Sequence, residues 1–166
     1  MRTTFLVLAL GLATVVAAVV AIGYALPQGH VASRTAVLDA PPAQVFATIL
    51  DVARHSEWRP NVEKVEVAGT DPLRWREHSG GDVIPFEVVE SRPHALLRVR
   101  IAASDLPFGG TWSYELEPQG TGTRITITEH GEVYNPIFRF MSRFVFGHTA
   151  TIDSFLGGLQ TRVASR

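Results

Sequence analysis

The feature that most limits the possible folds of this chain is an alternation of apolar and polar residues along residues 64–127. Its clearest part is Leu97, Val99 and Ile101, which are separated by two arginines. A period of two puts successive side chains on opposite faces of a β-strand, so the region predicts five or six strands that each have one dry face. Turn residues such as Gly80-Gly81-Asp82 separate the strands at hairpin spacing, which predicts antiparallel neighbours because a parallel pair needs a longer crossover.

The segment from Pro136 to about Arg162 has a helical period instead. Proline suits the first turn of a helix, and the apolar residues that follow fall at steps of three and four. This predicts one long C-terminal helix whose apolar stripe must be covered by the sheet. Gly147, Gly157 and Gly158 each weaken the helix by about 1 kcal/mol and allow either a close approach to the sheet or a bend. The stripe consists of Ile137, Phe140, Met141, Phe144, His148, Ile152, Phe155 and Leu159.

Three shorter elements are predicted before the alternating region. Residues 31–39 form a first strand, and Pro41-Pro42 opens a short amphipathic helix. A second short helix or turn covers residues 55–60, which end in a proline. The complete order is strand, two short helices, several antiparallel strands and a long helix. We therefore predict an α+β fold in which a curved sheet covers the last helix.

A run of 22 residues without a charge, Phe5 to Leu26, precedes this domain. As a helix it is about 33 Å long, against a hydrocarbon core of about 30 Å, so it predicts a single transmembrane helix. Arg2 lies before it, which favours a cytoplasmic N-terminus and a domain outside the cytoplasm. A cleaved signal peptide is the alternative, because Gly23-Tyr24-Ala25 has small residues at the required spacing. The predicted division is an anchor at 1–27, a linker at 28–33 and a domain at 34–166.

Composition excludes several classes of function. The formal net charge is -1, which gives no electrostatic reason to bind nucleic acid. There are no cysteines, so disulfides and thiolate chemistry are excluded, and the six histidines never stand four apart as two metal ligands on one helix would. The motifs GxSxG, HExxH, GxGxxG and the P-loop are not present in the sequence. We predict no metal, no cofactor and no catalytic residue.

Two groups of motifs carry a resemblance to a known superfamily. The segment 40–46, with Asp51 and Trp58-Arg59-Pro60, resembles the N-terminal signature of the START-like or Bet v 1-like helix-grip proteins (SRPBCC). More specifically, it resembles their polyketide cyclase/dehydrase and lipid-transport branch, and residues 110–116 with 122–124 resemble the late-strand signature. The similarity covers about residues 31–163. It implies a sheet of six to seven strands wrapped around the C-terminal helix, with a lipid, polyketide or other apolar molecule between them.

The predicted inward-facing side chains are the candidate ligand-binding residues. A curved sheet and one helix tend to leave a concave apolar space, and aromatic side chains offer the largest contact area to an apolar ligand. For each residue the alternative is that it fills the core, and the resemblance favours a cavity for the set as a whole. The candidates are Trp58, Trp75, Phe86, Val99, Ile101, Trp112, Tyr114, Phe140, Phe144 and His148.

Four polar residues near this space allow two interpretations each. His148 falls on the predicted helical stripe one turn after Phe144, where it either contacts the ligand or is a satisfied core residue. Glu129 shares strand parity with inward residues, but strand ends often twist outward, which favours solvent. Arg139 and Arg143 stand four apart, and a solvated helix face is favoured over contact with a headgroup or a ligand carboxylate.

These predictions favour a membrane-tethered module that binds or transfers a lipid or other small hydrophobic molecule. Its expected partners are that ligand and a membrane, which it crosses once through residues 5–26. Two alternatives stay open: a protein-interaction module with a filled core, and a polyketide cyclase- or dehydratase-like enzyme. An enzyme needs at least two convergent polar groups in the cavity, whereas a carrier needs almost none. An open apolar pocket would favour the carrier, and a solid core the interaction module.

Overall fold

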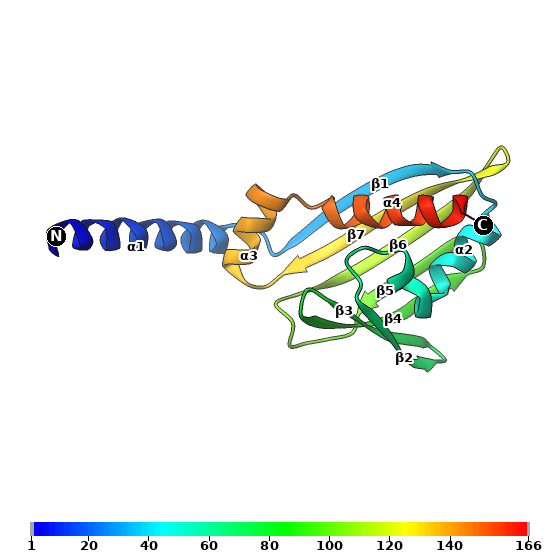
Figure 1. The fold of residues 1–166 in the computed structure, drawn as a ribbon, viewed down its shortest axis with the longest axis horizontal. Helices are drawn as coiled ribbons and strands as arrows, with labels where there is room; N and C mark the ends of the chain where they lie inside the picture. Colours follow the sequence, from blue (N-terminus) through cyan, green and yellow to red (C-terminus); the bar gives the residue numbers. More distant parts are fainter. Residues whose placement is uncertain (1, 166) are drawn as a thin grey trace.

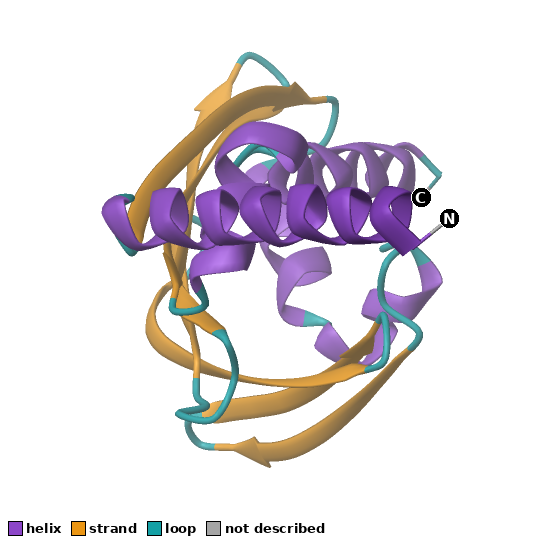
Figure 2. Ribbon diagram, turned by 90° about the vertical axis from the view of Figure 1, so that its left-hand side faces the viewer, coloured by secondary structure: helices purple, strands orange, loops and turns teal. Residues whose placement is uncertain are grey.

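The computed structural model describes residues 2–165, in which one antiparallel sheet curves around the helices (Figure 1, Figure 2). Its seven strands are ordered β1-β7-β6-β5-β4-β3-β2, so the first strand pairs with the last and the others form consecutive hairpins. The strands are β1 (Gly29–Leu38), β2 (Lys64–Thr70), β3 (Leu73–Ser79), β4 (Asp82–Arg92), β5 (Leu96–Ile101), β6 (Phe108–Gln119) and β7 (Gly122–Val133). The predicted α+β helix-grip architecture is confirmed.

Four α-helices and two short helical turns are also present in the described chain. They are α1 (Arg2–Ala25), α2 (Pro42–Leu50), the 3-10 helix η1 (Val52–Glu57), α3 (Pro136–Met141), the π-helical turn η2 (Ser142–Phe146) and α4 (Ala150–Ala164). The two short helices predicted after the first strand are therefore α2 and η1. α2 begins at Pro42 because the missing amide hydrogen of proline costs nothing in a first turn.

The C-terminal segment departs from the prediction of one continuous helix. α3 continues directly into η2, and η2 ends before α4 at Gly147, whose φ of 74° glycine adopts without a steric cost and no helix continues through. Gly158 serves the other purpose considered for these glycines, since a Cβ there would overlap the Trp58 carbonyl oxygen. One glycine bends the segment, and another allows close packing.

The linker predicted at 28–33 is also different in the structure. β1 begins at Gly29 and pairs with β7 from Gly29↔Glu132 onward, so most of that segment is strand. Its side chains are mixed in polarity and give a weak alternation. Backbone hydrogen bonds to β7 hold it in the sheet regardless of that pattern.

The packed core lies where α2 and α4 meet the sheet. Val45, Ile125, Ile127, Ile152 and Leu159 have no exposed surface. Burial of a large aliphatic side chain stabilises a fold by about 1.5–3 kcal/mol, so these five side chains contribute a large share of the stability. They come from α2, β7 and α4, which join both termini of the domain into one unit.

α1 projects from one end of the domain (Figure 1). Its segment Thr3–Ala25 is long and apolar enough to cross a membrane, with a mean hydropathy of 2.9, and its most apolar stretch is not buried in the protein. The end of α1 nevertheless contacts the domain, since a Cβ at Gly23 would overlap the backbone of Pro136 in α3.

Candidate functional site

A cavity of about 950 Å³ lies between the concave face of the sheet and the helices. The alternation of side chains along each strand explains which residues line the cavity, because residues two apart on one strand point to the same face of the sheet. Trp75 and Phe86 are directly opposite on β3 and β4, and their rings stack at 5.4 Å. The predicted site residues that line the cavity are Trp75, Phe86, Val99, Ile101, Trp112, Tyr114 and His148.

Three other predicted site residues lie outside the cavity wall. Trp58 packs edge-on against Phe155 at 5.2 Å, beside Gly158, and so belongs to the packed part of the domain. Phe140 and Phe144 contact each other at 5.0 Å, and Phe144 is 59% exposed. The expectation that Phe144 and His148 share one helix face is wrong, because the bend at Gly147 intervenes.

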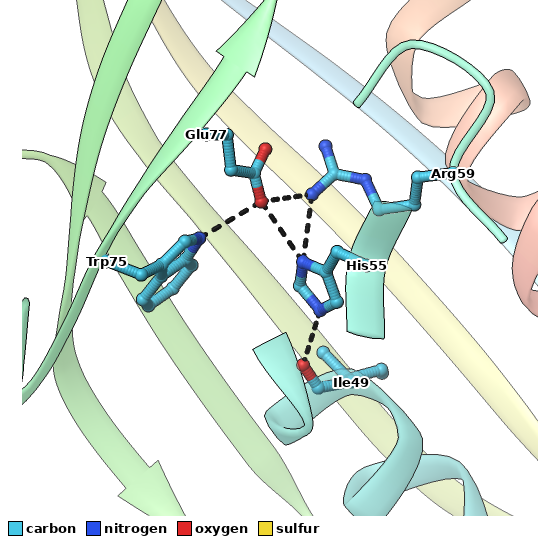
Figure 3. Close-up of polar contacts among 5 residues, drawn as sticks. All are labelled: Ile49, His55, Arg59, Trp75 and Glu77. Carbon is cyan, nitrogen blue, oxygen red and sulfur yellow. Dashed lines mark hydrogen bonds and ion pairs between the residues drawn. The ribbon is translucent and has the colours of Figure 1, made fainter. Parts of the chain in front are cut away.

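One end of the cavity carries a buried polar cluster whose members are not among the residues predicted from sequence to bind a ligand, apart from Trp75 (Figure 3). Oε1 of Glu77 accepts hydrogen bonds from Nε1 of Trp75 at 3.0 Å and from Nη1 of Arg59 at 2.5 Å. Nδ1 of His55 lies 3.0 Å from the same oxygen, and its Nε2 donates to the Ile49 carbonyl at 2.9 Å. The available signal was strand parity, since Glu77 shares the inward face of β3 with Trp75.

The charge of Glu77 is stabilised by these partners. Burial alone would raise its pKa, but the hydrogen bond with His55 and the positive charge of Arg59 outweigh burial and lower the pKa below its usual value. Arg59 also lines the cavity and lies over the ring of Phe155 at 5.2 Å. This end of the cavity therefore holds an arginine that is already positioned by a buried carboxylate.

A second polar group lies at the end of the cavity nearer to α1. The rings of His30 and His148 stack at 4.0 Å, and Nε2 of His30 is 3.7 Å from Oε1 of Glu129. Oγ of Ser142 lies 3.0 Å from Nδ1 of His148. The favoured expectation of solvent exposure for Glu129 is wrong, because β7 is paired on both sides beyond this position and keeps its alternation to Val133.

Burial dominates the protonation of this second group. It raises the pKa of Glu129 to about 7. It also lowers the pKa values of His30 and His148, each assisted by a neighbouring positive charge. At neutral pH, Glu129 is therefore present in both forms and can donate or accept a hydrogen bond within the cavity.

Arg139 is buried, which corrects the expectation that it lies on a solvated face. Its Nη1 donates to the carbonyls of Gly23 and Leu26, both at 3.1 Å, and its Nη2 to the carbonyl of Tyr134 at 2.8 Å. The last carbonyls of a helix lack partners within it, and a cation there also suits the helix dipole. Arg139 thus joins the end of α1 to α3, whereas Arg143 is exposed as expected.

A smaller cavity of about 230 Å³ extends from Leu26 and Pro27 at the end of α1. It shares four lining residues with the larger cavity: His30, Val133, Ser142 and His148. Within residues 2–165, no group of three or more histidine, aspartate or glutamate side chains is arranged to hold a metal ion. The chemistry that these walls offer is apolar contact, with hydrogen-bonding and charged groups at two places.

Several solved structures share this fold at low sequence identity. A START superfamily protein from Mycobacterium smegmatis is 17% identical, with a TM-score of 0.67 over 82% of this chain and 98% of that chain. The Zhui aromatase/cyclase from Streptomyces sp. R1128 is 14% identical, with a TM-score of 0.67 over 83% of this chain and 95% of that chain. A point mutant of the norcoclaurine synthase from Thalictrum flavum is 13% identical, with a TM-score of 0.65 over 82% of this chain and 95% of that chain. These likenesses concern the fold alone.

Comparison by sequence identifies the family. No curated protein matches the chain. The family described as polyketide cyclase/dehydrase and lipid transport matches residues 30–164, which include all seven strands except the first residue of β1. This chain therefore belongs to the family described as polyketide cyclase/dehydrase and lipid transport.

Proposed function

We propose that this protein binds a lipid or another small hydrophobic molecule in the 950 Å³ cavity, and that α1 holds the binding domain at a membrane. The observation that carries the proposal is the open space itself. Small-molecule pockets commonly measure about 300–1,000 Å³. A protein-interaction module with a filled core would not leave such a space between its sheet and its helices.

The proposed ligand contacts are the predicted site residues that border the cavity. Trp75, Phe86, Trp112 and Tyr114 supply broad apolar surface, while His148 supplies a polar group near α1. Burial raises the pKa of the Tyr114 phenol, which therefore stays neutral at physiological pH. Apolar walls with separated polar ends suit an amphipathic molecule better than a pure hydrocarbon.

One observation favours a catalytic role as the second candidate. Glu129 faces the cavity with a pKa of about 7, which suits a general acid or base at neutral pH. A cyclase- or dehydratase-like enzyme would use it together with a second polar group of the wall. A carrier releases its ligand unchanged, so the mass of the released molecule after incubation distinguishes the two functions.

The binding proposal is tested by filling the cavity from α4. Ser154 lines the space, so Ser154→Phe should abolish retention of a fluorescent fatty acid by the full-length protein in detergent. Gln160→Phe is the matched control, because Gln160 is on the same helix and is exposed. Equal retention by wild type and both variants would show that the fatty acid binds elsewhere and would contradict the proposal.

The anchoring proposal includes a retained helix, a cytoplasmic N-terminus and a domain outside the cytoplasm. Its support is the length of α1 and the bonds from Arg139 to Gly23 and Leu26. Cleavage after Ala25 would remove the Gly23 carbonyl from a buried guanidinium. Edman sequencing of the membrane fraction that began at Leu26 would contradict retention. An active cytoplasmic reporter fused after Arg166 would contradict the orientation.

A further inference from the structure

The exposed aromatic side chains of the domain are concentrated in one place. Among the described residues beyond α1 they are Tyr134, Phe138 and Phe144, which are 40%, 51% and 59% exposed. Ile137 and Val145 are exposed beside them. We call these five residues the α3 face. The other large apolar residues exposed on the domain are single valines on strands, whereas a cluster of exposed aromatic residues marks an interaction surface.

The α3 face is fixed to the end of the proposed transmembrane helix. Arg139 of α3 binds the carbonyls of Gly23 and Leu26, and Gly23 packs against Pro136 without room for a side chain. In Figure 1, α3 lies where α1 meets the domain. A helix that crosses a bilayer ends at its interface, so α3 lies at that level, together with the exposed Tyr24 in the last turn of α1.

One exposed carboxylate borders this face, because Glu132 accepts a hydrogen bond from the hydroxyl of Tyr134 at 2.6 Å. The segment that follows Glu132 carries only positive formal charge. Residues 133–152 contain no aspartate or glutamate, while Arg143 is exposed and lies over the ring of Phe144 at 5.9 Å. Basic residues beside a membrane helix are attracted to anionic lipid headgroups. Aromatic rings are enriched at the level of those headgroups. The face thus combines apolar insertion with attraction to an anionic surface.

We propose that the α3 face rests on the bilayer that α1 crosses, with its aromatic side chains at the headgroup level. The proposal depends on the membrane anchoring proposed above. It also gives the ligand a route, because Phe138 is both exposed and part of the wall of the large cavity. The smaller cavity leads from Leu26, at the end of α1, to His148. A hydrophobic molecule can then pass between bilayer and cavity without crossing water.

The chain has no cysteine, so a single introduced cysteine can carry a nitroxide label. Phe144→Cys, labelled in the full-length protein, is reconstituted in vesicles of phosphatidylcholine and phosphatidylglycerol. Collisions with oxygen report lipid, and collisions with a water-soluble nickel complex report water. Leu12→Cys in α1 is the lipid reference. Val37→Cys is the water reference, because it is exposed at the end of β1 far from α1.

The proposal predicts that the label at position 144 shifts from the nickel-accessible pattern of position 37 toward the oxygen-accessible pattern of position 12. A label at 144 that stays in water while the label at 12 is in lipid would overturn the α3 face and leave the anchor intact. Water at both positions would contradict the anchor itself. A label at 144 shielded from both reagents would overturn the proposal, since protein rather than lipid would then cover the face.

Discussion

The two ends of the cavity contain the same chemical group in opposite conditions. Glu77 is buried among Trp75, His55 and Arg59, and its pKa is lowered. Glu129 faces the same cavity with only a histidine 3.7 Å away, and burial raises its pKa to about 7. Hydrogen-bonding and charged partners, rather than burial, therefore decide which carboxylate stays charged. The carboxylate of Glu77 is already held by its protein partners, whereas the carboxyl group of Glu129 can change its protonation when a ligand binds.

The largest expected effect comes from removing the satisfied carboxylate. Glu77→Ala should destabilise the protein by about 3–5 kcal/mol, because Arg59 and His55 would keep buried polar groups without their common partner. Chemical denaturation of the full-length protein in detergent measures this loss of unfolding free energy. Glu115→Ala, exposed on β6, is the control. A loss below about 1 kcal/mol for Glu77→Ala would mean that the cluster contributes little to the fold.

Glu129→Gln should stabilise the protein, in contrast to Glu77→Ala. A carboxyl whose folded pKa is about 7, against a usual value of 4.5, makes the protein lose stability as the pH rises through that window. The variant has no such charge, so it should be more stable than wild type above pH 7 by at most about 3 kcal/mol. Near pH 4 the difference should disappear. Denaturation at several pH values tests this, and a difference that does not vary with pH would contradict the assigned cause.

Trp112→Ala probes the wall directly opposite Glu129, since the two residues are paired across β6 and β7. Truncation of a tryptophan in a filled core would lower the stability by about 3–5 kcal/mol, whereas truncation of one that borders open space should lower it less. We expect about 1–2 kcal/mol in a thermal melt, together with weaker retention of a fluorescent fatty acid. A cost of 4 kcal/mol or more, with unchanged retention, would indicate a filled core at this end.

The smallest effect on stability is expected for Phe144, which lies outside the cavity. Phe144 is largely exposed and absent from the cavity wall, so Phe144→Ala should change stability by no more than about 0.5 kcal/mol. Retention of the fatty acid in detergent should also be unchanged. Loss of binding in detergent would place this residue in the cavity after all.

The parts of the site that could be predicted from sequence depend on a local repeat. A period of two, which antiparallel pairing preserves along each strand, places four residues on the inward face: Val99, Ile101, Trp112 and Tyr114. The same parity applied to Glu129 gives its inward position, and only the assumption that the strand end twists away made that prediction wrong. Strand periodicity therefore extended further than expected in this sheet.

The remaining features depend on contacts between distant parts of the chain. Arg139 is buried because its partners are carbonyls of Gly23 and Leu26, more than a hundred residues earlier, which no local pattern reveals. The continuous stripe from Ile137 to Leu159 predicted one helix, but Gly147 takes a left-handed conformation. Three glycines lie in this segment, and only packing decides which of them bends the chain and which permits close approach.

Native mass spectrometry of the full-length protein, purified in detergent and incubated with a fatty acid, tests most directly whether the cavity binds an apolar molecule. We expect one bound apolar molecule on the wild type and on Gln160→Phe, and none on Ser154→Phe. Binding by all three proteins, or by none while each melts cooperatively, would contradict this expectation.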